Sequence, residues 1–135
     1  MAIDYDMGTG RNELMYRITH EKESDDLIAE IEKCEDVNYS DKYRYTYLHF
    51  AAQSHQVGVI KALLERGANP NALDNRGAVP ILAAIGRKND SNAEILKLFL
   101  QHGMDLNILI HGKTLKAAIE EFEDDKYNAI IAEYL

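Results

Sequence analysis

A pattern that repeats every 33 residues limits the folds open to this sequence more than any other feature. Residues 41–73 align with residues 74–109, so that Asp41 falls on Asp74. After an insertion of three residues near positions 88–90, the segment VIKALLERGANPN falls on ILKLFLQHGMDLN. A repeat of this length is a single supersecondary unit that cannot bury its apolar face alone. We therefore expect consecutive units to stack against one another in one array.

The apolar residues within each unit are spaced as they are on helices. In the first unit, the apolar residues of segment 59–64 fall on one helical face, and Gly67 follows as a left-handed stop. In the second unit, Ser91 and Glu94 have the spacing of a capping box ahead of the run ILKLFL. Leu98 of that run is expected in the core. Such short helices are marginal alone and need stacking to persist.

These features resemble the ankyrin repeat. The first unit keeps T-Y-L-H-F-A-A and VIKALLERGANPN, and the second keeps D-N-R-G, Pro80 and EILKLFLQHGMDLN. The resemblance implies an all-α fold, an ankyrin-repeat solenoid of about four helix-turn-helix repeats joined by β-turn fingers. It also implies a single domain over residues 1–135, with a divergent N-terminal capping repeat at about 10–40, repeats at 41–73 and 74–109, and a truncated C-terminal capping repeat at 110–135.

The segment DKYRYTYLHFAA, residues 41–52, has tyrosines at alternate positions, which is typical of a strand, yet two alanines follow. In the ankyrin pattern, residues 41–45 are a β-turn finger and a helix begins near Thr46. The hydroxyl of Thr46 suits the capping position of that helix. We therefore expect Tyr47 in the first helical turn and Leu48 on the inward face.

Two positions near this finger differ between the units. The family uses the position of His49 to join neighbouring turns by hydrogen bonds, which favours a structural role over catalysis; the equivalent residue in the second unit is Leu82. Arg44 stands where the second unit has the turn glycine Gly77. Either this finger is tilted or Arg44 accepts an unusual backbone conformation.

The composition excludes several classes of protein. The 135 residues carry a formal net charge of −8, which argues against binding to nucleic acid or to anionic membranes. The charge is uneven: residues 1–40 hold 11 acids and 4 bases, whereas residues 41–109 hold 6 acids and 8 bases. The start MAIDYDMGTG lacks the apolar run of a signal peptide. The single cysteine, Cys34, favours a reducing, cytoplasmic setting.

No motif of catalysis, metal binding or cofactor binding stands out. The five histidines have no ligand spacing, and a single cysteine excludes a cysteine-based zinc site. The segment HGKT at 111–114 resembles the end of a P-loop, but Asn107 stands where that motif requires a glycine. We therefore expect no cofactor, no metal and no enzymatic activity.

The resemblance implies a non-catalytic module that binds a protein partner through the concave surface of its fingers and inner helices. The residues expected on that surface are Lys42, Tyr43, Arg44, Tyr45, Gln53, Ser54, Asn75, Arg76, Ala78 and Arg87. Tyrosine and arginine often carry interface energy. For Tyr43 and Tyr45, contact with a partner and packing against the next finger both remain open.

Small free-standing stacks of this kind include bacterial immunity proteins that neutralise a toxin, as well as adaptors and inhibitors. The mildly basic middle of the chain predicts an acidic patch on the partner, whereas contact through the acidic ends would suit a basic partner such as a nuclease toxin. The alternative is a small enzyme or ligand-binding protein built on the same stack, which requires convergent polar groups in a pocket.

Overall fold

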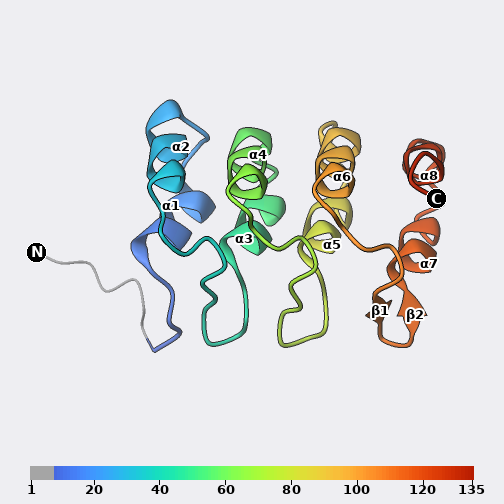
Figure 1. The fold of residues 1–135 in the computed structure, drawn as a ribbon, viewed down its shortest axis with the longest axis horizontal. Helices are drawn as coiled ribbons and strands as arrows, with labels where there is room; N and C mark the ends of the chain where they lie inside the picture. Colours follow the sequence, from blue (N-terminus) through green and yellow to red (C-terminus); the bar gives the residue numbers. More distant parts are fainter. Residues whose placement is uncertain (1–7) are drawn as a thin grey trace, which may run out of the picture.

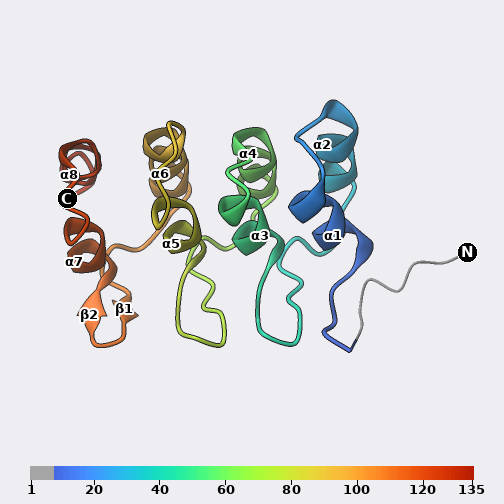
Figure 2. The ribbon, with the colours of Figure 1, turned by 180° about the vertical axis from the view of Figure 1, so that it is seen from behind.

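The computed structural model describes residues 8–135, and within that range eight helices form four consecutive pairs. Figure 1 shows the pairs side by side in one row, and Figure 2 shows the same row from behind. The pairs are α1 (Glu13–His20) with α2 (Asp25–Glu32), α3 (Tyr47–Gln53) with α4 (Val57–Glu65), α5 (Pro80–Ile85) with α6 (Asn92–Gln101), and α7 (Leu115–Glu120) with α8 (Asp125–Ala132). The expected all-α solenoid of helix-turn-helix repeats is confirmed.

The helices begin where local chemistry satisfies their free amide groups. Thr46 caps α3: its hydroxyl accepts from the amide of His49, and the amide of Thr46 donates to the imidazole of His49. The expected capping box at Ser91 is wrong. Its hydroxyl donates to the side chain of Asn89 instead, and its backbone is already helical (φ −86°, ψ −3°) rather than extended.

The longer helices end at glycines in the left-handed conformation. Gly67 has φ 92° after α4, and Gly103 has φ 90° after α6. In the first case, the amide of Ala68 donates to the carbonyl of Leu63 at 3.0 Å, which closes a Schellman motif. Each helix thus stops in the same way, and the chain turns back at the same point in both units.

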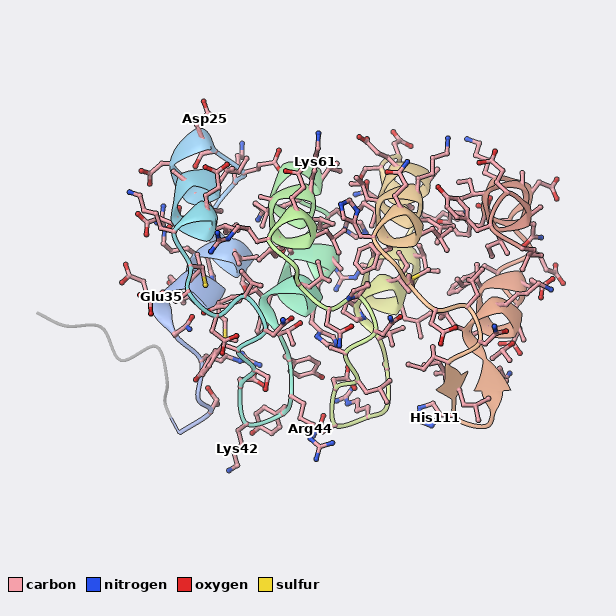
Figure 3. The ribbon with its side chains drawn as sticks, in the orientation of Figure 1. Asp25, Glu35, Lys42, Arg44, Lys61 and His111 are labelled. Carbon is pink, nitrogen blue, oxygen red and sulfur yellow. The ribbon has the colours of Figure 1, made fainter. Side chains whose placement is uncertain are left out.

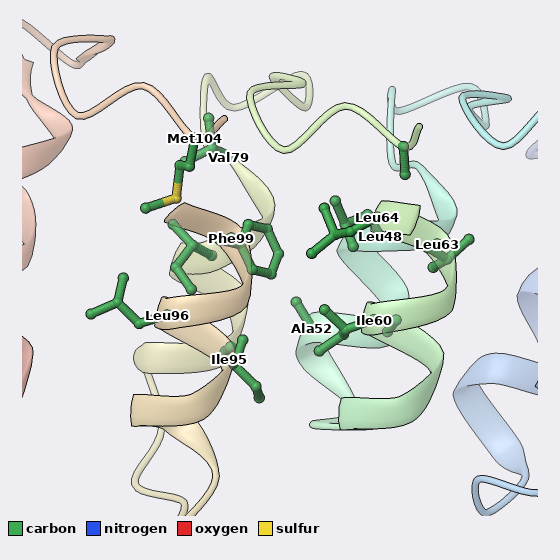
Figure 4. Packing of buried hydrophobic residues seen from close by; sticks show 14 of the residues in the cluster. Leu48, Ala52, Ile60, Leu63, Leu64, Val79, Ile95, Leu96, Phe99 and Met104 are labelled. Atoms are coloured by element: carbon green, nitrogen blue, oxygen red, sulfur yellow. The ribbon is translucent and has the colours of Figure 1, made fainter. Parts of the chain in front are cut away.

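A continuous apolar core runs through the stack. The largest fully buried side chains include Leu48, Ile60, Leu63, Ile81, Ile95, Leu96 and Phe99. Figure 4 shows several of them, including Leu48, Ile60 and Phe99, in the space around the second and third helix pairs. Phe99, and not the half-buried Leu98, takes the inward position on α6, because Phe99 is the residue that aligns with the buried Leu63 of α4. Each helix pair packs against its neighbours in the row.

Three loops project from one edge of the stack (Figure 1). We call residues 41–46 finger 1, residues 74–79 finger 2 and residues 109–114 finger 3. Finger 3 is a hairpin of strands β1 (Leu109–Ile110) and β2 (Lys113–Thr114). Its two-residue turn, His111 and Gly112, has φ values of 51° and 84°, as a type I′ hairpin requires.

In the described part of the chain, no helix has the length and apolar character needed to cross a membrane.

Candidate functional site

Fingers 1 and 2 have the same shape because each is organised by one buried aspartate. Asp41 accepts hydrogen bonds from the amides of Tyr43 and Tyr45, both at 2.9 Å. Asp74 accepts in the same way from the amides of Arg76 at 2.8 Å and Ala78 at 3.1 Å. These bonds hold the fingertips rigidly on the helical stack, so their exposed side chains have fixed positions.

Arg44 completes finger 1 by taking a left-handed conformation with φ 64°, close to the φ of 78° at Gly77 in finger 2. The finger is therefore not tilted, and the unusual backbone expected as the alternative is present. A side chain that bears a Cβ is strained in this region. Arg44 is exposed at the fingertip, as Figure 3 shows.

His49 joins the two fingers. Its Nδ1 accepts from the amide of Thr46 at 3.0 Å, and its Nε2 lies 3.3 Å from the carbonyl oxygen of Ala78. Because an amide only donates, Nδ1 is unprotonated and Nε2 carries the proton that Ala78 accepts. Burial lowers the pKa of His49, against smaller opposing effects of the Ala78 carbonyl and the Asp74 carboxylate. The imidazole is therefore neutral near pH 7 and serves as a structural link.

A groove of about 420 Å³ lies between α3 and α5, next to finger 2. Its base contains the apolar side chains of Phe50, Val79, Leu82 and Ala83. We call this the α3–α5 groove. Its lining residues are Arg11, Tyr45, His49, Phe50, Gln53, Asp74, Arg76, Ala78, Val79, Leu82, Ala83 and Arg87.

Three arginines line this groove, and they differ in how they are paired. Arg11 forms an ion pair with Asp41, with Nε 3.1 Å from the carboxylate, and its guanidinium lies 5.1 Å from the centre of the Phe50 ring. Within residues 8–135, the side chains of Arg76 and Arg87 form no ion pair and no hydrogen bond. Both are exposed, so two cations are available to a ligand.

A second, more open hollow of about 810 Å³ lies at the other ends of the helices, beside the loops that join each helix to its partner. Gln53 and Arg87 line both hollows. The second hollow has His20, Glu21 and Lys22 on one side. The two hollows therefore meet, and together they follow α3 from the fingers to the loops.

The structure brings half of the expected binding residues into the α3–α5 groove: Tyr45, Gln53, Arg76, Ala78 and Arg87. Ser54 lies in the second hollow. The remaining residues, Lys42, Tyr43, Arg44 and Asn75, line neither hollow; Figure 3 shows Lys42 and Arg44 at the tip of finger 1.

The two tyrosines of finger 1 differ in their surroundings. Tyr45 is half-buried, with its ring 5.9 Å from that of Phe50 and 5.7 Å from that of His49. Tyr43 keeps 38% of its surface exposed, and its carbonyl accepts from the amide of Asn75 at 2.9 Å. Tyr45 therefore packs locally as well as lining the groove, while the Tyr43 side chain remains accessible.

The expected binding residues did not include Arg11 or the four apolar residues at the base of the groove, Phe50, Val79, Leu82 and Ala83. The repeat itself contained the signal for two of them, because Phe50 and Ala83 are 33 residues apart and occupy equivalent helical positions. Arg11 lies before the aligned units, so no periodicity pointed to it. In the described part of the chain, no group of three or more histidine, cysteine, aspartate or glutamate side chains is arranged to hold a metal ion.

Comparisons with known proteins agree on one family. The family model described as ankyrin repeats (many copies) matches residues 31–81. The chain is 32% identical over 107 residues to human transient receptor potential cation channel subfamily A member 1, a match that covers 78% of this chain and 8% of the channel. It is 40% identical over 63 residues to an ankyrin repeat protein of Acanthamoeba polyphaga mimivirus, covering 45% of this chain and 39% of that protein.

A solved structure is similar over most of the chain. The human ASB11 ankyrin repeat domain matches with a TM-score of 0.69 at 22% identity, covering 93% of this chain and 55% of that one. The chain spans less than half the length of the two relatives named above.

Proposed function

Because the chain is an ankyrin-repeat protein, we propose that it is a non-catalytic module that binds another protein through fingers 1 and 2 and helices α3 and α5. Ankyrin repeats are in general a protein–protein interaction scaffold. The observation that carries the proposal is the α3–α5 groove, where an apolar base lies beside two unpaired arginines. Arginine and tyrosine beside apolar surface are the residues that most often dominate interface energy.

The alternative, an enzyme or small-ligand-binding protein, has less support. The buried histidine of the groove, His49, is already bonded to Thr46 and Ala78. Use of His49 as a general base would break the link between the fingers, because Nδ1 has no free lone pair and Nε2 is the donor. Asp74 is similarly occupied by the amides of Arg76 and Ala78.

Within the binding class, the finer role that we propose is neutralisation of a partner by direct contact, as an immunity protein does with its toxin; adaptor and inhibitor roles use the same face. The single cysteine, Cys34, supports a cytoplasmic setting. The role is tested by measuring the activity of the purified partner with and without an equimolar amount of this protein. A neutralising protein abolishes the activity of the partner, whereas an adaptor leaves that activity intact.

The binding face is tested with a bulky substitution that blocks access to it without changing its charge. Gln53 is exposed and lines both hollows, so Gln53→Trp places a large side chain between them. Lys61→Trp is the matched control, since Lys61 is exposed on α4 and points away from the fingers (Figure 3). We expect Gln53→Trp to lose partners that the parent and Lys61→Trp both capture from native cells. If all three capture the same proteins equally, the proposed face is wrong.

A further inference from the structure

The chemistry of the α3–α5 groove indicates what kind of segment would fit it. Two partly exposed apolar residues, Leu82 and Ala83, lie on α5 in the middle of the groove. Leu82 stands where the preceding unit has His49, so an apolar surface replaces a hydrogen-bonding one at this position. Covering these side chains with an apolar group of a partner would remove them from water.

The two free cations lie at either end of this apolar surface. Arg76 precedes α5 in finger 2, and Arg87 follows the end of α5. The helix has six residues, which at 1.5 Å per residue gives on the order of 9 Å between its ends. An extended chain rises about 3.3 Å per residue. Arg76 and Arg87 lie beyond the two ends of α5 and both line the groove, so an extended segment that runs along α5 passes both side chains.

The nearby carboxylates do not neutralise these arginines. Asp41 is paired with Arg11. Asp74 receives the amides of Arg76 and Ala78 on one oxygen, and its other oxygen lies 3.9 Å from Nε2 of His49. The groove lining therefore contains three arginines and one aspartate, and its two arginines without an ion pair are Arg76 and Arg87.

We propose that the α3–α5 groove binds an extended acidic segment of a partner protein, with one apolar side chain seated on Leu82 and Ala83 and a carboxylate on each side bound by Arg76 and Arg87. A guanidinium presents a planar pair of donors that matches a carboxylate. The inference rests on the proposed function and adds the chemistry of the partner: an apolar residue flanked by aspartate or glutamate.

The probe for this inference is a displayed library of random peptides, selected on the full chain. We expect enrichment of sequences with an apolar residue between two acidic ones. For an enriched peptide, replacing either acidic residue by its amide should weaken binding roughly tenfold or more, because a charge-assisted hydrogen bond is lost. The double variant Arg76→Gln, Arg87→Gln should weaken binding by at least the same factor.

The matched control is Lys42→Gln, Arg44→Gln, which also removes two cations, at a fingertip outside the groove. This control should bind the acidic peptides almost as the parent does. Enrichment of basic or uncharged peptides, no enrichment, or equal losses in the two double variants would each overturn the inference. The experiment separates failure of this inference from failure of the proposed function. If Gln53→Trp blocks the native partner while Arg76→Gln, Arg87→Gln does not, the binding face is right and the acidic segment is wrong.

Discussion

His49 shows how one side chain can fix the geometry of a binding face. It spans from the start of α3 to the carbonyl of Ala78 in finger 2, so the two fingers cannot move independently while the imidazole is neutral. Its neutral state follows from burial, which lowers its pKa below the ordinary value of 6.5. Protonation would place a second proton on Nδ1, against the donating amide of Thr46.

The first prediction concerns the pH dependence of this link. Because the folded-state pKa of His49 is lowered, the unfolded chain binds the proton more readily, and stability falls as pH drops below 6.5. The variant His49→Leu, which copies Leu82, should lose about 1–3 kcal/mol of unfolding free energy at pH 7.5, since two polar groups lose their partner. This loss should shrink toward pH 5 in denaturant titrations. A difference that stays constant with pH would contradict the account.

The second prediction concerns the strained backbone at Arg44. Its φ of 64° costs on the order of 1–2 kcal/mol for a residue with a Cβ, whereas the added freedom of glycine in the unfolded chain costs about 0.5–1 kcal/mol. Arg44→Gly should therefore raise the unfolding free energy slightly, by roughly 0.5–1 kcal/mol. Lys42→Gly at a fingertip position without positive φ should lower it. Equal destabilisation by both would show that Arg44 is not strained.

At the scale of elements, the polar links between helix pairs are unevenly distributed. Between the first and second pairs, Gln56 donates to the carbonyls of Ile18 at 2.6 Å and Glu21 at 2.9 Å. The second and third pairs are joined by the His49 link and by Asn71, whose side chain accepts from the amide of Asp105 at 2.8 Å.

The last interface in the row is poorer in such links. Among the described residues, α6 and α8 share one side-chain hydrogen bond, from Asn92 to the hydroxyl of Tyr127 at 3.0 Å. In the described part of the chain, three buried side-chain oxygens have no hydrogen-bond partner: those of Asn92 on α6, Asn128 on α8 and Gln56 beside the first pair. Buried polar atoms without partners cost stability, so this interface depends mostly on apolar contact.

The third prediction concerns how easily the two terminal helices unfold locally. Helices α2 and α8 both belong to terminal pairs. The pair that contains α2 is joined to its neighbour by several side-chain hydrogen bonds, from Gln56 to the carbonyls of Ile18 and Glu21 and from the amide of Val59 to Glu23, whereas α8 has one, between Tyr127 and Asn92. Amide hydrogen exchange under native conditions should therefore show α8 (Asp125–Ala132) opening at a lower free energy than α2 (Asp25–Glu32). Equal protection of the two terminal helices, or faster exchange in α2, would rule out this difference.

The arrangement of these elements could be predicted from the sequence alone, because short motifs within each repeat specify where helices begin and end. Thr46, His49 and the glycines that end the helices each have a fixed place in the pattern. The start of α6 was not predictable in the same way, because the three-residue insertion before it brings Asn89 into competition for the hydroxyl of Ser91. The half-buried position of Leu98 could have been predicted from the repeat, which pairs Phe99 rather than Leu98 with the buried Leu63.

The groove was predictable only in part. The resemblance to ankyrin repeats implied that Tyr45, Gln53, Arg76, Ala78 and Arg87 share one face, and these residues do line the groove. The depth and charge of the groove depend on residues and contacts that the repeat pattern does not specify. Arg11 arrives from before the aligned units, and the pairing of Asp41 and Asp74 decides which arginines remain free. It remains a prediction that a partner contacts the fingertip residues Lys42, Tyr43, Arg44 and Asn75.

At the scale of the whole molecule, stability comes from stacking, so a terminal pair protects the apolar face of its neighbour. Leu96 and Leu100 on α6 are buried, with 0% and 7% of their surfaces exposed. The fourth prediction is that removal of residues 110–135 uncovers this face and causes association, seen as a larger species in size-exclusion chromatography with light scattering. Leu96→Glu introduced into the truncated chain should reduce that association. A truncated chain that stays monomeric with unchanged melting would contradict the role of α7 and α8 as a cap.

The central claim is that a protein binds on the side of the fingers and helices α3 and α5. The most direct test is hydrogen exchange of the full chain with and without a captured partner. We expect added protection at Gln53, Leu82 and Ala83 and at finger 2, with no change on the outer surface of α4 around Lys61. Protection confined to the acidic residues 1–40, or to α4 and α6, would contradict the claim and point to a basic partner bound elsewhere on the stack.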